Sequence, residues 1–132
     1  MTRVLIVEDQ PTDLQIAAEV IRSLKISDID AHISASAAKL YLDEVVDGTQ
    51  SPPDVIVLDL DLGYESGHEI LRLWHSNPKL ACIPLIVWTA MGKEQQEVCR
   101  LFKVGAVVPK WEGAAALKRA LEPFADSASQ EP

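Results

Sequence analysis

The chain has 132 residues, 48% hydrophobic and 24% charged, a composition that excludes disordered, collagen-like and low-complexity proteins and suits one globular domain. The net charge is −8, and residues 1–66 carry thirteen Asp and Glu against four Lys and Arg, so we expect no nucleic-acid binding through this surface. Two cysteines are too few for a disulfide framework, no apolar run is long enough to span a membrane, and the first residues do not form a secretory signal, so we expect a cytoplasmic protein.

Apolar runs alternate with helical periodicity through the first half of the chain. A β-rich run (RVLIV) predicts a strand at residues 3–7, and apolar residues at helical spacing follow from Pro11 to Leu24. A weaker alternation predicts a second strand at 29–33, followed by a helix over 35–46. After a loop rich in Gly, Ser and Pro at 47–53, the run VIVL predicts a third strand at 55–58.

The second half continues the same alternation. A loop marked by Gly63 and Gly67 leads to a helix over 68–75, which ends before the dipeptide Asn77-Pro78. A fourth strand is predicted at 84–88, a helix over 94–103 closed by Gly105, a fifth strand at 106–108 and a last helix over 114–124. Residues 126–132 form a polar tail. Five strands alternating with five helices predict an α/β fold with a parallel sheet covered on both faces.

Polar residues follow four of the five predicted strands. Ligands of open α/β sheets lie beyond the carboxyl ends of the strands, so these positions are the candidate site. Glu8 and Asp9 follow the first strand and Asp59 follows the third; Thr89 and Lys110 follow the fourth and fifth. If the first and third strands are neighbours, the three carboxylates meet in one pocket, where their repulsion requires a cation.

This set of residues is consistent with one kind of chemistry. Carboxylates are the ligands of a hard divalent ion, above all Mg²⁺. A carboxylate beside such an ion is a competent nucleophile toward phosphorus, because the ion screens the repulsion from phosphate oxygens. Lys110 and Thr89 would bind the remaining phosphoryl oxygens as donors. The residues therefore predict reversible phosphorylation of an aspartate.

The ordered pattern resembles the receiver domain of two-component response regulators, of the kind found in chemotaxis. It comprises Glu8-Asp9 after the first strand, Asp59 with Gly67 eight residues later, Thr89-Ala90 after the fourth strand and Lys110 after the fifth. Each element is weak by itself, whereas the full set in this order is highly specific. The resemblance covers about residues 3–125 and implies a (βα)5 flavodoxin-like fold with the strand order 2-1-3-4-5, in a receiver domain of residues 1–125.

The resemblance implies a role for each of these positions. Asp59 would accept the phosphoryl group, while Thr89 and Lys110 would bind its oxygens. Asp9 and Asp59 would ligate Mg²⁺ or Mn²⁺ directly, the backbone carbonyl of Asp61 would be a third protein ligand, and Glu8 would act through a bound water. The domain would be a signalling module and not an enzyme, apart from its own phosphorylation and dephosphorylation.

Three departures from the family pattern concern loops at the site. Gly63 stands where receivers usually have Pro, which should loosen that loop. Gly105 and Lys110 are only five residues apart, so Val107 stands nearest to the family's switch aromatic and has no ring to rotate. Trp111 replaces the Pro that usually follows the lysine and is a candidate for a partner surface, whereas Trp88 is expected to point away from Thr89 into the core.

Two alternatives remain open at this stage. A degenerate receiver could act as an interaction scaffold without phosphorylation. The run VLDLDLG also resembles the D-x-D motif of haloacid dehalogenase-type phosphatases, with Asp59 as nucleophile and Asp61 as general acid, although that motif normally opens its domain.

The receiver interpretation also predicts partners. A sensor histidine kinase or a phosphotransfer protein would supply the phosphoryl group, and an unidentified downstream protein would recognise the activated surface. We expect either a stand-alone receiver or a receiver excised from a longer protein, as a monomer or an activation-linked dimer that contacts neither nucleic acid nor membrane.

Overall fold

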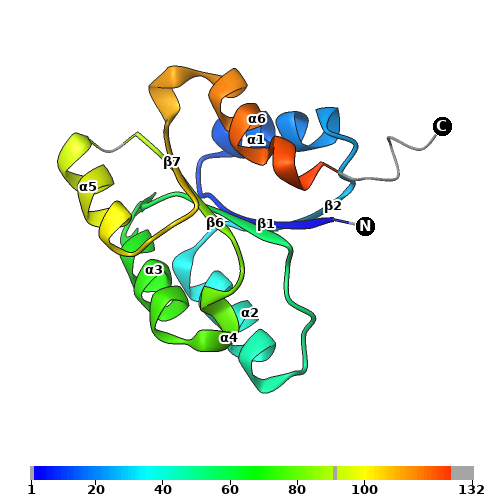
Figure 1. Ribbon diagram of the computed structural model, residues 1–132, viewed down its shortest axis with the longest axis vertical. Coiled ribbons are helices and arrows are strands. Elements are labelled where there is room, and N and C mark those ends of the chain that lie inside the picture. The colour runs from blue at the N-terminus through cyan, green and yellow to red at the C-terminus, as the bar shows by residue number, and fades with distance from the viewer. Residues whose placement is uncertain (1, 91, 126–132) are drawn as a thin grey trace.

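The computed structural model describes residues 2–90 and 92–125, in which a parallel sheet carries helices on both faces (Figure 1). The sheet strands are β1 (Arg3–Val7), β2 (Asp28–His32), β3 (Val55–Leu58), β6 (Leu85–Thr89) and β7 (Ala106–Pro109), and a separate hairpin joins β4 (Asp61–Leu62) to β5 (Glu65–Ser66). The helices are α1 (Pro11–Ser23), α2 (Ala35–Asp47), α3 (Gly67–Ser76), α4 (Pro78–Ala81), α5 (Lys93–Leu101) and α6 (Ala114–Leu121), with 3₁₀ turns η1 (Lys110–Glu112) and η2 (Glu122–Phe124).

The sheet has the strand order β2-β1-β3-β6-β7, and each strand runs parallel to its neighbours. This is the predicted order 2-1-3-4-5 when only the five sheet strands are counted, so the flavodoxin-like fold is confirmed. The order places β1 beside β3, and the carboxyl ends of both strands therefore lie at one edge.

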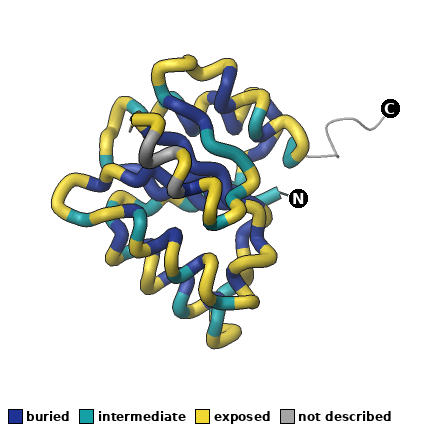
Figure 2. The backbone as a smooth tube through the Cα atoms, turned by 60° about the vertical axis from the view of Figure 1, so that its left-hand side comes forward, coloured by how far each residue is buried: buried dark blue, intermediate teal, exposed yellow. Residues whose placement is uncertain are grey.

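Each face of the sheet has its own apolar core. Helices α1 and α6 cover one face, where they pack on inward residues such as Val4 and Ile6 of β1. Helices α2 to α5 cover the other face, against Leu5 and Val7 of the same strand. The central strands are buried along their length while the outer helix surfaces are exposed (Figure 2). No helix in the described ranges is long and apolar enough to cross a bilayer.

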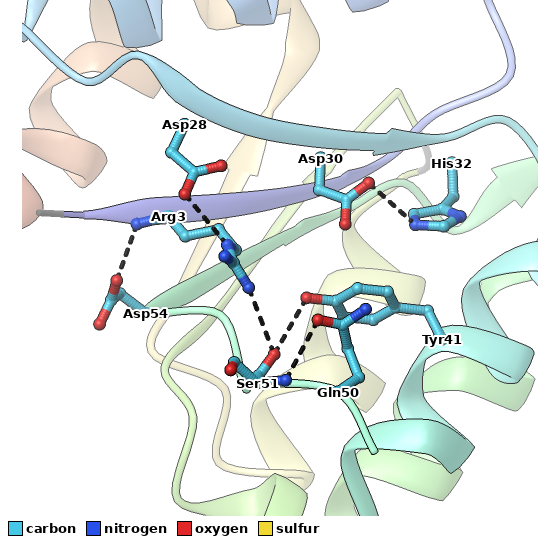
Figure 3. Close-up of polar contacts among 8 residues, drawn as sticks. All are labelled: Arg3, Asp28, Asp30, His32, Tyr41, Gln50, Ser51 and Asp54. Atoms are coloured by element: carbon cyan, nitrogen blue, oxygen red, sulfur yellow. Dashed lines mark hydrogen bonds and ion pairs between the residues drawn. The ribbon is translucent and has the colours of Figure 1, made fainter. Parts of the chain in front are cut away.

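A polar network ties the amino-terminal edge of the sheet together (Figure 3). The Arg3 guanidinium donates to Asp28 at 3.1 Å, and the backbone N–H of Arg3 donates to Asp54 at 2.7 Å. The hydroxyl of Tyr41 on α2 donates to the carbonyl of Ser51 at 3.2 Å. These contacts fix β1, β2, α2 and the loop before β3 relative to one another, at the edge opposite the candidate site.

The predicted elements match the observed ones within one or two residues at most boundaries, but the hairpin strands β4 and β5, the short helix α4 and the 3₁₀ turn η1 were missed. The hairpin β4–β5 has only two residues in each strand, too few to show a periodicity. Helix α4 begins at Pro78 directly after Asn77, whose side chain accepts a hydrogen bond from Lys79 N–H at 3.0 Å.

The end of the chain also differs from the prediction. The last helix was expected to reach residue 124, but α6 ends at Leu121 and continues as the 3₁₀ turn η2. The predicted polar tail at 126–132 lies outside the described residues.

Candidate functional site

Three carboxylates converge at the carboxyl ends of β1 and β3. One ligand oxygen from each of Glu8, Asp9 and Asp59 lies within 4.8 Å of the other two, and we call these residues the acidic triad. The pairing of β1 with β3 is the cause, since the backbone N–H of Asp59 donates to the carbonyl of Val7 at 3.0 Å. Glu8 and Asp59 are buried, and Asp9 is half-buried.

Lys110 reaches the acidic triad from the end of β7. Its ammonium Nζ lies 2.8 Å from Glu8 Oε1 and 2.9 Å from Asp59 Oδ2. A third carboxylate, Asp13 Oδ2 in the first turn of α1, lies at 2.8 Å. Sequence reasoning missed Asp13, and the only signal for it was an acidic residue in a predicted first helical turn directly after the Glu8-Asp9 pair.

Burial and charge act on both partners of the Glu8–Lys110 pair. Burial raises the pKa of Glu8 to about 7, against the opposing hydrogen bond from Lys110, and the charge of Asp59 adds to the rise. Burial acts to lower the pKa of Lys110, but hydrogen bonds to Asp13, Glu8 and Asp59 outweigh it and raise that pKa. The site therefore keeps its one ammonium charged while its carboxylates repel one another.

The acidic triad fits a hard divalent cation. Asp9 Oδ1 is buried and has no hydrogen-bond partner within the described part of the chain. A buried carboxylate oxygen without a partner is costly unless a cation or water meets it. Three carboxylates within reach of one point are the donor set that Mg²⁺ or Mn²⁺ prefers.

Thr89 lies at the same edge of the sheet as the acidic triad. The register of β6 with β3 pairs Val87 with Leu58, so Thr89 ends β6 level with the residues that follow β3. Its side chain is fully buried. Lys110 follows Pro109, which pairs with Thr89 across β6 and β7, so the two predicted phosphate-binding residues lie on adjacent strands.

The hairpin β4–β5 places Asp61 and Gly63 near the acidic triad. The backbone N–H of Asp61 donates to Asp59 Oδ1 at 3.1 Å, while the Asp61 side chain is exposed. Gly63 has φ +71°, which proline cannot adopt because its ring fixes φ at about −65°. A Cβ at this position would lie 3.2 Å from Asp9 Oδ2. This turn therefore favours glycine and excludes the proline that is usual in the family at this position.

Glu65 fixes that hairpin to the start of α2. One carboxylate oxygen accepts the backbone N–H of Ala35 at 3.0 Å, and the other accepts the Ser36 hydroxyl. The hydrogen bond from Ser36 lowers the pKa of Glu65. Sequence reasoning did not single out Glu65, because its partners lie about thirty residues away and no local pattern links them.

Gly67 lies against the backbone that carries Asp59. A Cβ at Gly67 would come within 2.3 Å of the Asp59 carbonyl oxygen and 2.7 Å of Leu60 Cα, and the Gly67 N–H donates to the Leu60 carbonyl at 2.9 Å. Any side chain here would push the Asp59 backbone away from α3. The glycine eight residues after the candidate acceptor thus has a steric cause.

Replacing Gly67 by Ala is therefore expected to destabilise the fold by about 2 kcal/mol or more, because overpacking against backbone cannot relax through a rotamer change. Urea unfolding measures this free energy. The matched control is Gly92→Ala, where a Cβ meets no atom within 4 Å and the expected cost is below about 1 kcal/mol. Equal stability of the two variants would contradict the steric explanation.

The two tryptophans near the site have different surroundings. Trp88 is buried in the core under α1 and α6, as strand alternation predicted, but its ring centroid also lies 4.9 Å from Lys110 Nζ. Trp111 is 60% exposed beside Lys110, and Val107 packs partly buried against the opposite core.

The comparisons with known proteins agree with this geometry. The response regulator receiver domain family matches residues 4–122. The response regulator Rcp1 of Synechocystis sp. (strain ATCC 27184 / PCC 6803 / Kazusa) is 34% identical over 100 residues, covering 72% of this chain and 66% of Rcp1, just under two thirds of its length.

Two solved structures are similar over nearly the whole chain. The Mn(2+)-bound form of response regulator Rcp1 has a TM-score of 0.78 at 25% identity, covering 93% of this chain and 91% of that one. The bacteriophytochrome response regulator RtBRR has a TM-score of 0.78 at 26% identity, covering 96% of this chain and 80% of that one.

Proposed function

Because this chain belongs to the response regulator receiver domain family, we propose that it is a phosphoryl-accepting switch with Asp59 as the acceptor. The observation that carries the proposal is the position of Asp59, which is buried beside Glu8 and Asp9 and paired with Lys110 at 2.9 Å. This cluster brings a nucleophilic carboxylate, a candidate cation site and an ammonium within a few ångströms of one another.

We propose the divalent-ion ligands from this cluster. Asp9 and Asp59 would bind Mg²⁺ or Mn²⁺ directly, Glu8 through a water, and the Asp61 carbonyl would complete the protein ligands. The Mn(2+)-bound form of Rcp1 supports a metal at this site. When bound, the ion screens the negative charge of the acceptor from that of the incoming phosphoryl oxygens.

The phosphoryl transfer needs only a phosphohistidine as donor, and the later release of phosphate needs only water. An oxygen of Asp59 attacks phosphorus, and the new O–P bond forms as the P–N bond of a phosphohistidine breaks; the ring, protonated on its other nitrogen, takes the electron pair and leaves as neutral imidazole. Lys110 and Thr89 would donate to the phosphoryl oxygens, which gain charge during transfer. Attack of water on phosphorus later releases inorganic phosphate and restores the Asp59 carboxylate.

The phosphorylated state would then change a surface that a partner recognises. Movement of Thr89 and Lys110 toward the phosphoryl group would shift the segments that carry them, namely the ends of β6 and β7. Val107 offers no ring to rotate, so we propose that this signal passes through residues 105–112, the segment of β7 and η1 that includes the exposed Trp111.

The donor and the cellular setting are proposed by analogy with the family. We propose a sensor histidine kinase or phosphotransfer protein as donor, in the cytoplasm, and a receiver domain of residues 1–125 followed by a tail. RtBRR is a bacteriophytochrome response regulator, so a bacteriophytochrome is the first donor to test.

The proposal is tested by incubating the chain with Mg²⁺ and acetyl phosphate. A base-labile phosphoryl adduct that forms once per chain, requires the metal and maps to the peptide containing Asp59 is the expected result. If neither an adduct nor metal binding were observed, the alternative function as a phosphorylation-independent interaction scaffold would be favoured. Repeated turnover of a free phosphate ester would instead favour the haloacid dehalogenase-type reaction.

A further inference from the structure

Lys110 has more carboxylate partners than the proposed acceptor site needs. Its ammonium contacts Glu8 and Asp59 of the acidic triad, and it also lies 2.8 Å from Asp13 Oδ2. Asp13 lies in the first turn of α1 and is not among the carboxylates that gather as candidate metal ligands. The ammonium is therefore shared between the acidic triad and a separate helix.

Trp88 adds a second contact that does not use the acidic triad. Its ring centroid lies 4.9 Å from Lys110 Nζ, within the range of a cation–π interaction. The ring is buried among apolar residues on the α1 and α6 face, and its indole N–H has no hydrogen-bond partner in residues 2–90 and 92–125. Packing holds the ring in place, so its face is a fixed support for the ammonium.

A divalent ion at the acidic triad would compete with Lys110 for carboxylate oxygens. The ammonium lies 2.8 Å from Glu8 Oε1 and 2.9 Å from Asp59 Oδ2, which is hydrogen-bonding distance. Two cations that share such oxygens repel one another, and Lys keeps its charge near neutral pH. An ammonium with no other partners would therefore oppose binding of the ion.

We propose that Asp13, with the face of Trp88, is a positioning site that holds Lys110 beside the acidic triad while a divalent ion occupies the carboxylates. The inference rests on the proposed function and adds a residue that acts on the metal site through Lys110. On ion binding, Lys110 gives up its contact with Glu8 and keeps that with Asp13. Because Asp13 holds the ammonium when it leaves Glu8, Asp13 strengthens ion binding through Lys110. Lys110 also stays within reach of the phosphoryl oxygens on Asp59.

The test is a double-mutant cycle read as Mn²⁺ affinity, measured by calorimetry on the full chain. Asp13→Asn is expected to weaken Mn²⁺ binding roughly five- to tenfold when Lys110 is present, and less than about twofold in a Lys110→Met background. Asp13→Glu is expected to restore much of the loss, since it returns the carboxylate. Glu19→Gln removes one exposed charge from the same helix and controls for the general field.

The outcomes separate this inference from the proposed function. Equal Mn²⁺ affinity of the wild type and Asp13→Asn would overturn the role of Asp13 and leave Asp59 as the proposed acceptor. An equal loss in both backgrounds would mean that Asp13 acts on the ion directly, which also overturns the inference. No Mn²⁺ binding by the wild-type chain would overturn both the inference and the metal site, and thermal unfolding verifies that every variant is folded.

Discussion

Asp59→Asn is expected to abolish phosphoryl incorporation from acetyl phosphate, to less than about one hundredth of the wild-type level. A neutral amide oxygen is a much weaker nucleophile than a carboxylate oxygen. Asn is close to Asp in size and its side-chain oxygen still accepts from the Asp61 N–H, which Asp59 binds at 3.1 Å. The variant should therefore fold, and base-labile phosphate counted by mass spectrometry measures the loss.

Asp61→Asn is the matched control for this experiment. Its side chain is exposed, and the proposed metal ligand is its backbone carbonyl, so labelling of Asp59 is expected to continue. In a haloacid dehalogenase-type mechanism, Asp61 would be the general acid and the same variant would lose turnover. Labelling that persisted in Asp59→Asn would place the acceptor elsewhere in the acidic triad and contradict the proposal.

Lys110→Met is expected to lower the free energy of unfolding by about 3–5 kcal/mol near pH 8 without metal. The variant keeps a long side chain but leaves the buried Glu8 and Asp59 carboxylates without their ammonium, which now lies 2.8 and 2.9 Å from them. Urea unfolding measures the difference. Lys118→Met, an exposed lysine on α6, is the control and should change stability by less than about 0.5 kcal/mol.

The pH dependence of this loss has a definite sign. Burial raises the pKa of Glu8 to about 7, so its folded form binds a proton more tightly than the unfolded chain does. Loss of Lys110 removes a hydrogen bond that opposes this rise, so the pKa of Glu8 in Lys110→Met should lie above about 7, and protonation of Glu8 should relieve the variant as the pH falls toward 7. The destabilisation should be smaller near pH 5.5 and should also shrink when Mg²⁺ is added. If the loss of unfolding free energy in Lys110→Met were the same at both pH values and with or without Mg²⁺, its cause would be packing and not charge.

Local patterns were sufficient for the strands and for most of the helices. Apolar runs at 3–7 and 55–58 coincide with β1 and β3 because strands buried on both faces leave an unbroken hydrophobic signal. The acidic triad was also foreseen, because residues that follow adjacent parallel strands meet at one edge of the sheet.

The contacts made by Asp13 and Glu65 could not be read in the same way. Asp13 and Lys110 are 97 positions apart, and Glu65 lies about thirty positions from Ala35 and Ser36. Trp88 shows the same limit, because alternation along β6 predicts a buried ring but says nothing of a lysine that arrives from β7.

The sequence alone determined the order of strands and helices and the identity of the acids at the strand ends, since both depend on spacing within a few residues. The tertiary structure decided the partners of each acid, because a distance in space depends on how the strands and helices pack. Packing gave Asp59 a buried place beside Lys110 and gave Lys110 a third carboxylate, Asp13, on another helix. It also brought Gly67 against the Asp59 backbone, so only the folded chain explains why that residue has no side chain.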